Sequence, residues 1–204
     1  MSIKIKVFPK KLENLIREIH KLPTIGTKTA EKIALYLLSL DQEEKNNLIN
    51  SINELKDVKL CKACFNFCEK DYCDICLDKK RDSSVICVVA YPKNIQTIEA
   101  SSKFNGKYHV LHGVLDTING ISEEDIKLKE FFLRVEKNKN KIKEIILGLS
   151  PTIEGEATMI YISNKLKKYN IKITRFARGI QVGLDIDYTD IITLQDAISK
   201  RTDI

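Results

Sequence analysis

The sixteen residues CKACFNFCEKDYCDIC, from Cys61 to Cys76, hold five of the six cysteines of this chain. Cys61, Cys64, Cys73 and Cys76 form two C-x2-C pairs with eight residues between them. Each pair suits a tight turn that directs both sulfurs inward, and two pairs supply the four ligands of a tetrahedral zinc site. Because four thiolates close the coordination sphere, the spacing predicts one structural zinc ion per chain rather than a catalytic one.

Cys68 lies between the two pairs and leaves alternatives open. It could in principle displace one of the four ligands, although two symmetrical pairs make the simpler ligand set. A dithiol redox centre is a rival function for the cluster, but a single C-x-x-C would suffice for it. The sixth cysteine, Cys87, falls in an apolar run and is expected to be a buried core thiol.

The composition is that of a globular protein, with 204 residues of which 43% are hydrophobic. The opening residues MSIKIKVFPKK lack the apolar stretch of a signal peptide, and no uncharged apolar run reaches the roughly 18 residues of a membrane span. We therefore expect a cytoplasmic protein with no membrane partner. In that reducing compartment clustered cysteines are more often metal ligands than disulfides, which favours zinc.

The sequence before the cysteines has the periodicity of helices. Apolar residues recur at helical spacing from Leu12 to Leu22 and again from Ala30 to Leu38. Asp41, with Glu44 three residues later, is expected to open a third helix. That helix would carry Leu48, Ile52 and Leu55.

The segment LPTIGT, residues 22–27, separates the first two helices and has the form of a helix-hairpin-helix turn. Pro23 is expected to end the first helix, because proline cannot continue it. Gly26 is expected to take the left-handed conformation of a tight reversal. Thr27 is expected to cap the second helix with its side-chain oxygen.

The N-terminal sixth of the chain is basic. Residues 1–32 contain eight Lys or Arg and three Glu, so they contribute +5 to a total net charge of +6. Lys28 and Lys32 share one face of the second helix, where they can neutralise a phosphate held by the amides of the turn. This predicts salt-sensitive DNA binding that is blind to base sequence, and the alternative is an ordinary helical hairpin with exposed lysines.

After the cysteines, strand-like and helix-like segments alternate. Strands are expected at residues 84–90, 108–113, 144–149 and 172–177, and helices at 92–101, 122–135 and 155–169. Such alternation predicts an α/β domain with a mainly parallel sheet covered by helices. The tail is expected to hold a short strand and a helix from Leu194 to Ser199.

The predicted organisation is therefore an α/β chain with an all-α N-terminal module. A helical helix-hairpin-helix domain would span 1–57, a four-cysteine zinc finger 58–82, the α/β domain 83–177 and a C-terminal segment 178–204.

The remaining polar candidates are less specific. Glu154 and Glu156, in SPTIEGEAT, follow a strand and open a helix, where carboxylates serve metal chemistry or simply favour the helix dipole. The three histidines are expected to be surface or packing residues.

The order of these parts resembles the RecR family of recombination mediators over nearly the whole chain. LPTIGTKTAEKIALYLL is similar to the hairpin of that family, and CKACFNFCEKDYCDIC to its zinc finger. RDSSVICVV resembles the first strand of its Toprim domain. SPTIEGEATMIYI and ARGIQVG resemble later Toprim and C-terminal segments.

The resemblance implies a non-enzymatic DNA-repair scaffold that forms a ring-like homotetramer on single- or double-stranded DNA. It would act with RecO and RecF to help load RecA at single-stranded gaps. It also implies that Lys28 and Lys32 face DNA, that Glu154 and Glu156 lie on a partner-binding Toprim surface, and that residues 178–204 make an oligomer contact. By the same resemblance the zinc ligands are Cys61, Cys64, Cys73 and Cys76.

Two departures from the Toprim pattern bear on catalysis. Toprim enzymes hold magnesium with a glutamate at the end of the first strand and a D-x-D after a later strand. In this chain the corresponding positions are occupied by Ala90 and by Ser150-Pro151-Thr152. The alternative function is a magnesium-dependent nuclease or phosphotransferase using Glu154 and Glu156, and the missing carboxylates argue against it.

Overall fold

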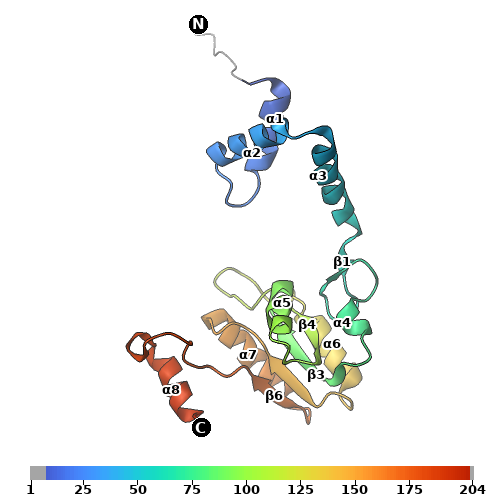
Figure 1. The fold of residues 1–204 in the computed structure, drawn as a ribbon. Coiled ribbons are helices and arrows are strands. Elements are labelled where there is room, and N and C mark those ends of the chain that lie inside the picture. The colour runs from blue at the N-terminus through green and yellow to red at the C-terminus, as the bar shows by residue number, and fades with distance from the viewer. Residues whose placement is uncertain (1–7, 203–204) are drawn as a thin grey trace. The chain divides into compact units, whose positions relative to one another are not determined.

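The computed structural model describes residues 8–202, which form two compact units (Figure 1). The first unit ends at Asp57 and the second begins at Val58. Lys4 and Lys6 of the basic N-terminal run lie outside the described residues, as do the first seven residues of the predicted 1–57 domain and the last two of the predicted 178–204 segment. None of the helices in the described part combines the length and apolar character needed to span a membrane.

The first unit is helical, as predicted. It contains α1 (Lys10–His20), α2 (Thr27–Ser39), α3 (Gln42–Glu54) and the short 3-10 helix η1 (Leu55–Asp57). α1 and α2 pack through a small core in which Ile19, Ala30 and Ala34 are buried. The two alanines have short side chains, so the helices can approach closely.

The third helix begins where the sequence predicted. The Asp41 carboxylate accepts from the Glu44 amide at 2.8 Å, and the Glu44 carboxylate accepts from the Asp41 amide at 3.2 Å. This reciprocal capping box satisfies two amides that the helix itself cannot pair. The three predicted apolar residues of this helical segment are nevertheless exposed: Leu48, Ile52 and Leu55.

The turn between α1 and α2 differs from the prediction. The helix α1 ends at His20, before Pro23, and the left-handed residue is Thr24, with φ of 66°. The amide of Ile25 donates to the Leu22 carbonyl at 3.2 Å, so proline and threonine occupy the centre of a turn that requires positive φ at its second central position.

The predictions for the start of α2 were wrong for the same reason. Because the reversal is completed at Thr24, Gly26 has φ of −79° and serves as the N-cap of α2. Thr27 is then the first helical residue, and α2 begins without a side-chain cap hydrogen bond.

The second unit starts with a small cysteine-bearing module. β1 (Lys59–Leu60) and β2 (Phe67–Cys68) pair antiparallel, and the one-turn helix α4 (Asp74–Leu77) follows. Beyond it lies a four-stranded sheet of β3 (Asp82–Val89), β4 (Gly106–Val110), β5 (Glu144–Leu147) and β6 (Lys172–Arg175). The strand order is β4-β3-β5-β6 and every pair is parallel, which confirms the predicted α/β fold.

The connections between these strands are helical. They are α5 (Pro92–Ala100), α6 (Leu128–Asn138) and α7 (Ile153–Leu166). The predicted helix at 122–135 starts too early, because Ser122 donates from its amide and hydroxyl to the Asp125 carboxylate and so forms a local turn. The predicted strand at 108–113 runs too far, since β4 ends at Val110 and His112 has φ of 60°.

The tail contains the 3-10 helix η2 (Ile186–Tyr188) and α8 (Ile191–Ser199). The predicted helix is present but begins three residues earlier, where the Asp190 carboxylate accepts from the Thr193 amide at 2.9 Å. The predicted short strand is absent from the described residues 178–202.

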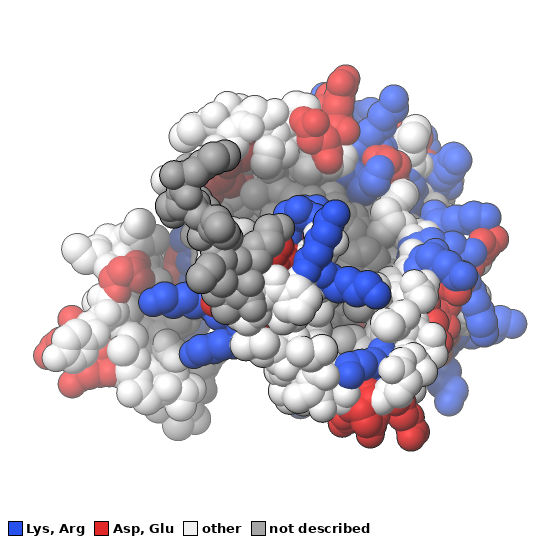
Figure 2. All heavy atoms as spheres, turned by 90° about the horizontal axis from the view of Figure 1, so that it is seen from above, with Lys and Arg blue, Asp and Glu red and all other residues white. Residues whose placement is uncertain are grey.

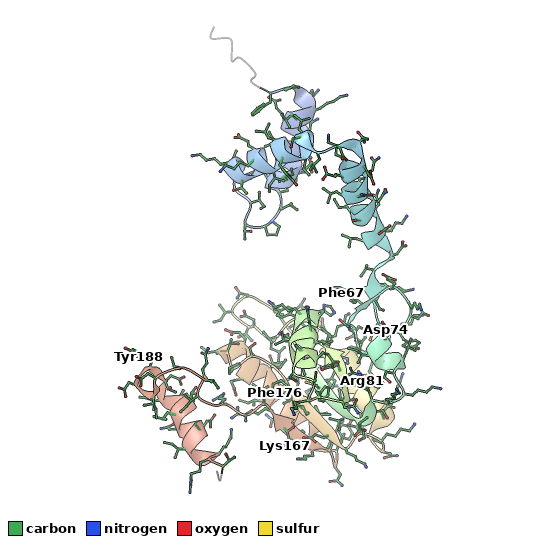
Figure 3. All side chains as sticks on the ribbon, viewed as in Figure 1. Phe67, Asp74, Arg81, Lys167, Phe176 and Tyr188 are labelled. Carbon is green, nitrogen blue, oxygen red and sulfur yellow. The ribbon has the colours of Figure 1, made fainter. Side chains whose placement is uncertain are left out.

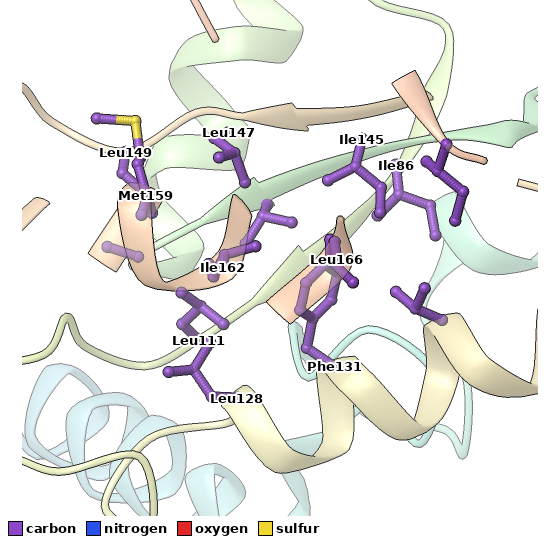
Figure 4. Close-up of a cluster of buried hydrophobic side chains, with 14 of the residues drawn as sticks. Ile86, Leu111, Leu128, Phe131, Ile145, Leu147, Leu149, Met159, Ile162 and Leu166 are labelled. Atoms are coloured by element: carbon purple, nitrogen blue, oxygen red, sulfur yellow. The ribbon is translucent and has the colours of Figure 1, made fainter. Parts of the chain in front are cut away.

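The two faces of the sheet carry separate hydrophobic clusters. One cluster packs β3 and β5 against α6 and α7 through residues such as Ile86, Phe131, Ile145, Ile162 and Leu166 (Figure 4). The other includes Cys87, Val89, Tyr108, Val110 and Ile95 of α5. Alternate residues of β3 therefore serve opposite faces, as expected for a sheet covered by helices on both sides.

We predict that Gly155→Ala destabilises the second unit by about 1–3 kcal/mol, because an added Cβ would lie 2.0 Å from the Ser150 carbonyl oxygen. Gly179→Ala is the matched control, since a Cβ there meets nothing within 4 Å. Thermal unfolding followed by circular dichroism measures both. Equal melting temperatures for the two variants would contradict the predicted clash.

Candidate metal centre and nucleic-acid interface

The structure brings the four predicted cysteines together. The Sγ atoms of Cys61, Cys64, Cys73 and Cys76 all lie within 4.8 Å of one another. A tetrahedral zinc ion with Zn–S bonds of about 2.3 Å holds its sulfurs about 3.8 Å apart, so these side chains fit zinc. No other group of three or more metal-ligating side chains occurs within residues 8–202.

Local backbone geometry forms the first thiol pair. The Cys61 amide donates to the Asn66 carbonyl at 2.7 Å, and the Phe65 amide donates to the Cys61 carbonyl at 2.9 Å. Phe65 has φ of 62°, which closes the turn behind Cys64. The thiol of Cys68 instead donates to the Lys70 carbonyl, so Cys68 lies outside the group of four.

The second thiol pair lies at the start of α4. Cys73 is the N-cap of this helix, and its amide donates to the Cys61 sulfur at 3.3 Å. Hydrogen bonds from the thiols of Cys64 and Cys76 lower the pKa of Cys73 and favour its thiolate. By contrast, burial raises the pKa of Cys87 to about 12, which agrees with its predicted role as a core thiol.

The outer edge of β4 holds both thiol pairs in place. The Val110 amide donates to the Cys64 carbonyl at 2.8 Å, and a hydrogen bond of 2.6 Å joins His112 Nε2 to the Phe65 carbonyl. Lys107 Nζ donates to the carbonyl of Ile75 at 2.7 Å, and also to those of Cys76 and Asp78. One strand of the sheet therefore anchors both halves of the metal centre.

A second cation lies beside the same strand. Arg134 of α6 donates through Nη1 to the Tyr108 carbonyl at 2.6 Å. Burial lowers the pKa of this guanidinium, and the nearby thiols of the cluster oppose that shift. Lys107 and Arg134 were not predicted as site residues, although they bring positive charge to a site that carries a net negative charge when four thiolates hold Zn²⁺.

His109 is a packing residue, as expected from the sequence. Its ring is fully buried, Nε2 bonds to the Lys127 carbonyl at 3.0 Å, and the rings of Phe65 and Phe131 lie against it. Burial lowers the pKa of His109 to about 3, so the ring is neutral at physiological pH.

The predicted DNA-binding lysines lie on the first unit. Lys28 and Lys32 are both exposed on α2, one turn apart. The first turn of α2 carries no acidic residue, and its N-cap Gly26 offers no side-chain oxygen. The amides at this end are therefore available to an anion, which the helix dipole also favours.

The carboxyl edge of the sheet carries an ion network rather than a metal site. Glu156 accepts from Arg175 Nη1 at 3.0 Å and from Arg178. Asp196 of α8 lies 3.4 Å from Arg178 and thereby ties the tail to the sheet. A cavity of about 290 Å³ lies at this edge, and its lining includes Glu156, both arginines and Phe176. Of these residues, Figure 3 labels Phe176.

The other predicted acidic position is separate from this network. Glu154 is half-buried, and it forms no ion pair with any described residue. At the catalytic positions of a Toprim enzyme, Ala90 is buried at the end of β3 and Ser150 follows β5. Glu154 and Glu156 therefore have no further carboxylate with which to form a magnesium cluster within residues 8–202.

We predict that Cys73→Ser lowers the zinc content of the purified chain well below one ion per chain, because one of four ligands is lost. Cys68→Ser is the control and should retain one zinc ion, since its sulfur lies outside the group. Elemental analysis of both proteins measures the stoichiometry. Full zinc loss in the Cys68 variant, with retention in the Cys73 variant, would contradict the assignment.

Comparisons with known proteins agree with this arrangement. Family models match residues 12–56 as a RecR helix-hairpin-helix, 58–78 as a RecR four-cysteine zinc finger domain and 84–177 as a Toprim domain. The relatives named "Recombination protein RecR" from two strains of Clostridium perfringens are each 41% identical to this chain over 199 residues. The alignments cover 97% of this chain and 99% of each relative. The chain therefore belongs to the RecR family, with a four-cysteine finger for one zinc ion between a helix-hairpin-helix and a Toprim domain.

Proposed function

We propose that this protein is a DNA-binding mediator of recombinational DNA repair, acting as a cytoplasmic scaffold and not as an enzyme. It works with RecO and RecF to help load RecA at single-stranded gaps. The observation that carries this proposal is the uncapped N-terminus of α2 beside two exposed lysines, in a family whose named relatives are recombination proteins.

The hairpin suits contacts to the DNA backbone. Main-chain amides at the start of α2 and the ammonium groups of Lys28 and Lys32 bind phosphate oxygens, which every base sequence presents alike. Binding of this kind accepts single- or double-stranded DNA and weakens as salt rises, because counterions compete for the phosphates. It therefore suits a protein that acts wherever a gap occurs.

A catalytic role has little support from the carboxyl edge of the sheet. A Toprim nuclease or phosphotransferase needs carboxylates for magnesium, and the positions that would supply them hold Ala90 and Ser150. Glu156 is already paired with two arginines. We therefore infer a non-enzymatic Toprim domain.

The partner-binding surface that we propose includes Glu154 and Glu156. The carboxylate of Glu154 forms no ion pair with any residue from 8 to 202, so a basic partner can reach it without competition. Glu156 can serve a partner only by giving up part of its contact with Arg175 or Arg178. Of the two, Glu154 is the stronger candidate for direct contact.

Exposed apolar surface supports assembly into a homotetramer. In the first unit, a hollow of about 610 Å³ is lined mainly by apolar residues of α1, α2 and α3, including Leu15, Leu38 and Ile49. In the tail, Val182 is 99% exposed and Tyr188 is 80% exposed (Figure 3). Two different self-association surfaces per chain are what a closed assembly of four copies requires.

We predict that Lys28→Glu combined with Lys32→Glu weakens DNA binding by about tenfold or more at low salt, because two phosphate contacts become repulsive. Fluorescence anisotropy with a labelled gapped duplex measures the affinity. Lys70→Glu with Lys93→Glu makes the same change in net charge at exposed sites outside the hairpin and should weaken binding less.

The same samples test the rest of the proposal. Light scattering should give the mass of four chains, and added magnesium should produce no cleavage of the DNA. Equal DNA affinity of the hairpin variant and the unmodified protein would contradict the DNA-binding assignment. A monomeric mass would contradict the tetramer, and magnesium-dependent cleavage of the DNA would contradict the non-enzymatic scaffold.

A further inference from the structure

Two lysine-rich turns follow helices α6 and α7 of the Toprim domain. Residues 136–144 and 165–172 together hold eight lysines and two glutamates. Their net charge of +6 equals that of the whole chain, so the rest of the chain is neutral in sum. The face of the molecule drawn in Figure 2 shows Lys and Arg side chains interspersed with Asp and Glu side chains. The eight lysines, all exposed, are Lys137, Lys139, Lys141, Lys143, Lys165, Lys167, Lys168 and Lys172.

The topology places both turns at the same edge of the sheet. In a parallel α/β sheet the strands begin at one edge, and the helices run back and end there. Glu144 at the start of β5 lies opposite Lys172 at the start of β6, and the Lys172 amide donates to the Lys143 carbonyl at 3.0 Å. The Tyr169 hydroxyl also donates to the Glu136 carboxylate. The two turns therefore form one continuous surface, which we call the lysine edge.

Most of the lysines on the lysine edge form no ion pair with a described residue. Lys139 pairs with Glu136 at 2.7 Å, and Lys172 lies 3.7 Å from Glu144. The other six lysines form no ion pair with the residues that the structure describes. Lys137 and Lys165 lie in the last turns of α6 and α7, where the helix dipole stabilises a positive side chain. Lys167 is the C-cap of α7, where the same dipole favours it, and the charge of Lys143 lowers the pKa of Asp82. Lys141, Lys143 and Lys167 nevertheless form no ion pair with a described residue.

The shape of the lysine edge suits an extended polyanion. A hollow of about 430 Å³ lies between the two turns, with Lys139, Lys168 and the side chains of Asn140 and Asn170 in its lining. Ammonium and amide groups are the donors that phosphate oxygens accept, and Glu136, which also lines the hollow, is already engaged by Lys139 and Tyr169. Because the unpaired lysines extend over both turns beyond this hollow, they match a chain of phosphates better than one small anion.

We propose that the lysine edge is a second DNA-binding surface, which contacts the phosphate backbone independently of the hairpin. The proposal rests on the proposed function only in that both take DNA as the ligand. Lys141, Lys143 and Lys167, the last labelled in Figure 3, carry the contact. Since these lysines belong to the amino edge of the sheet, the lysine edge lies opposite the edge that carries Glu156 and the arginine network.

The test compares two triple variants of the full chain by fluorescence anisotropy with a labelled duplex at several salt concentrations. Lys141→Glu, Lys143→Glu and Lys167→Glu together remove the unpaired charge of the lysine edge. Lys70→Glu, Lys93→Glu and Lys129→Glu change the net charge equally at exposed sites elsewhere in the second unit. Zinc content and thermal unfolding establish that both variants are folded, and glutamine versions of the same triples replace any that are not.

We expect the lysine-edge variant to bind at least tenfold more weakly at low salt. The slope of log K against log salt should shrink by about 2–3, since each phosphate contact contributes roughly 0.9. The control triple should change both quantities much less. Equal effects of the two triples would show that net charge alone weakens DNA binding, and this result would overturn the proposal. DNA binding that stays unchanged in the lysine-edge variant would also overturn it, including the case in which that variant loses an acidic protein partner. The Lys28 and Lys32 variant reports on the hairpin separately, so either DNA-binding assignment can fail without the other.

Discussion

The contact between the zinc finger and β4 is the constraint on which the second unit depends. β4 is an edge strand, and an unpaired strand edge leaves backbone groups open to association. Here the Val110 amide pairs with the Cys64 carbonyl, and Lys107 binds three carbonyls around the second thiol pair. A segment too small to build its own core thus covers the sheet, and zinc supplies the binding energy that holds that segment in shape.

Charge explains why two buried or half-buried cations belong at this contact. A zinc ion with four thiolates leaves a net charge of about −2, which is costly to bury without compensation. Lys107 and Arg134 bring positive charge to the sheet side of the finger while their hydrogen bonds satisfy main-chain carbonyls. The finger and the Toprim sheet are therefore one electrostatic unit as well as one packed unit. At the carboxyl edge of the sheet, Arg175 pairs with Glu156 and Arg178 with Asp196, and Ser150 lines the same cavity as Glu156 and the two arginines.

The fold and the metal centre could be predicted from the sequence because both depend on local, periodic signals. The C-x2-C pairs, the capping box at Asp41 and the alternation of strands and helices each have a short-range physical cause. Predictions from the sequence were wrong where a longer-range or competing contact determined the backbone conformation. One such residue is Thr24, which takes the left-handed conformation expected of Gly26. Lys107 and Arg134 gave no signal, because their role exists only once β4 and the finger lie side by side. The lysine edge needed the parallel topology, which brings two distant turns together.

Hydrogen exchange of the full chain with and without zinc tests the central claim that the metal supports the Toprim sheet through β4. If the account is correct, removal of zinc increases deuterium uptake in residues 106–113 as well as in the finger at 58–78. The strand β6, at the opposite edge of the sheet, serves as the internal reference and should change least. An increase confined to residues 58–78, with 106–113 as protected as before, would show that the finger folds on zinc alone and would contradict the account.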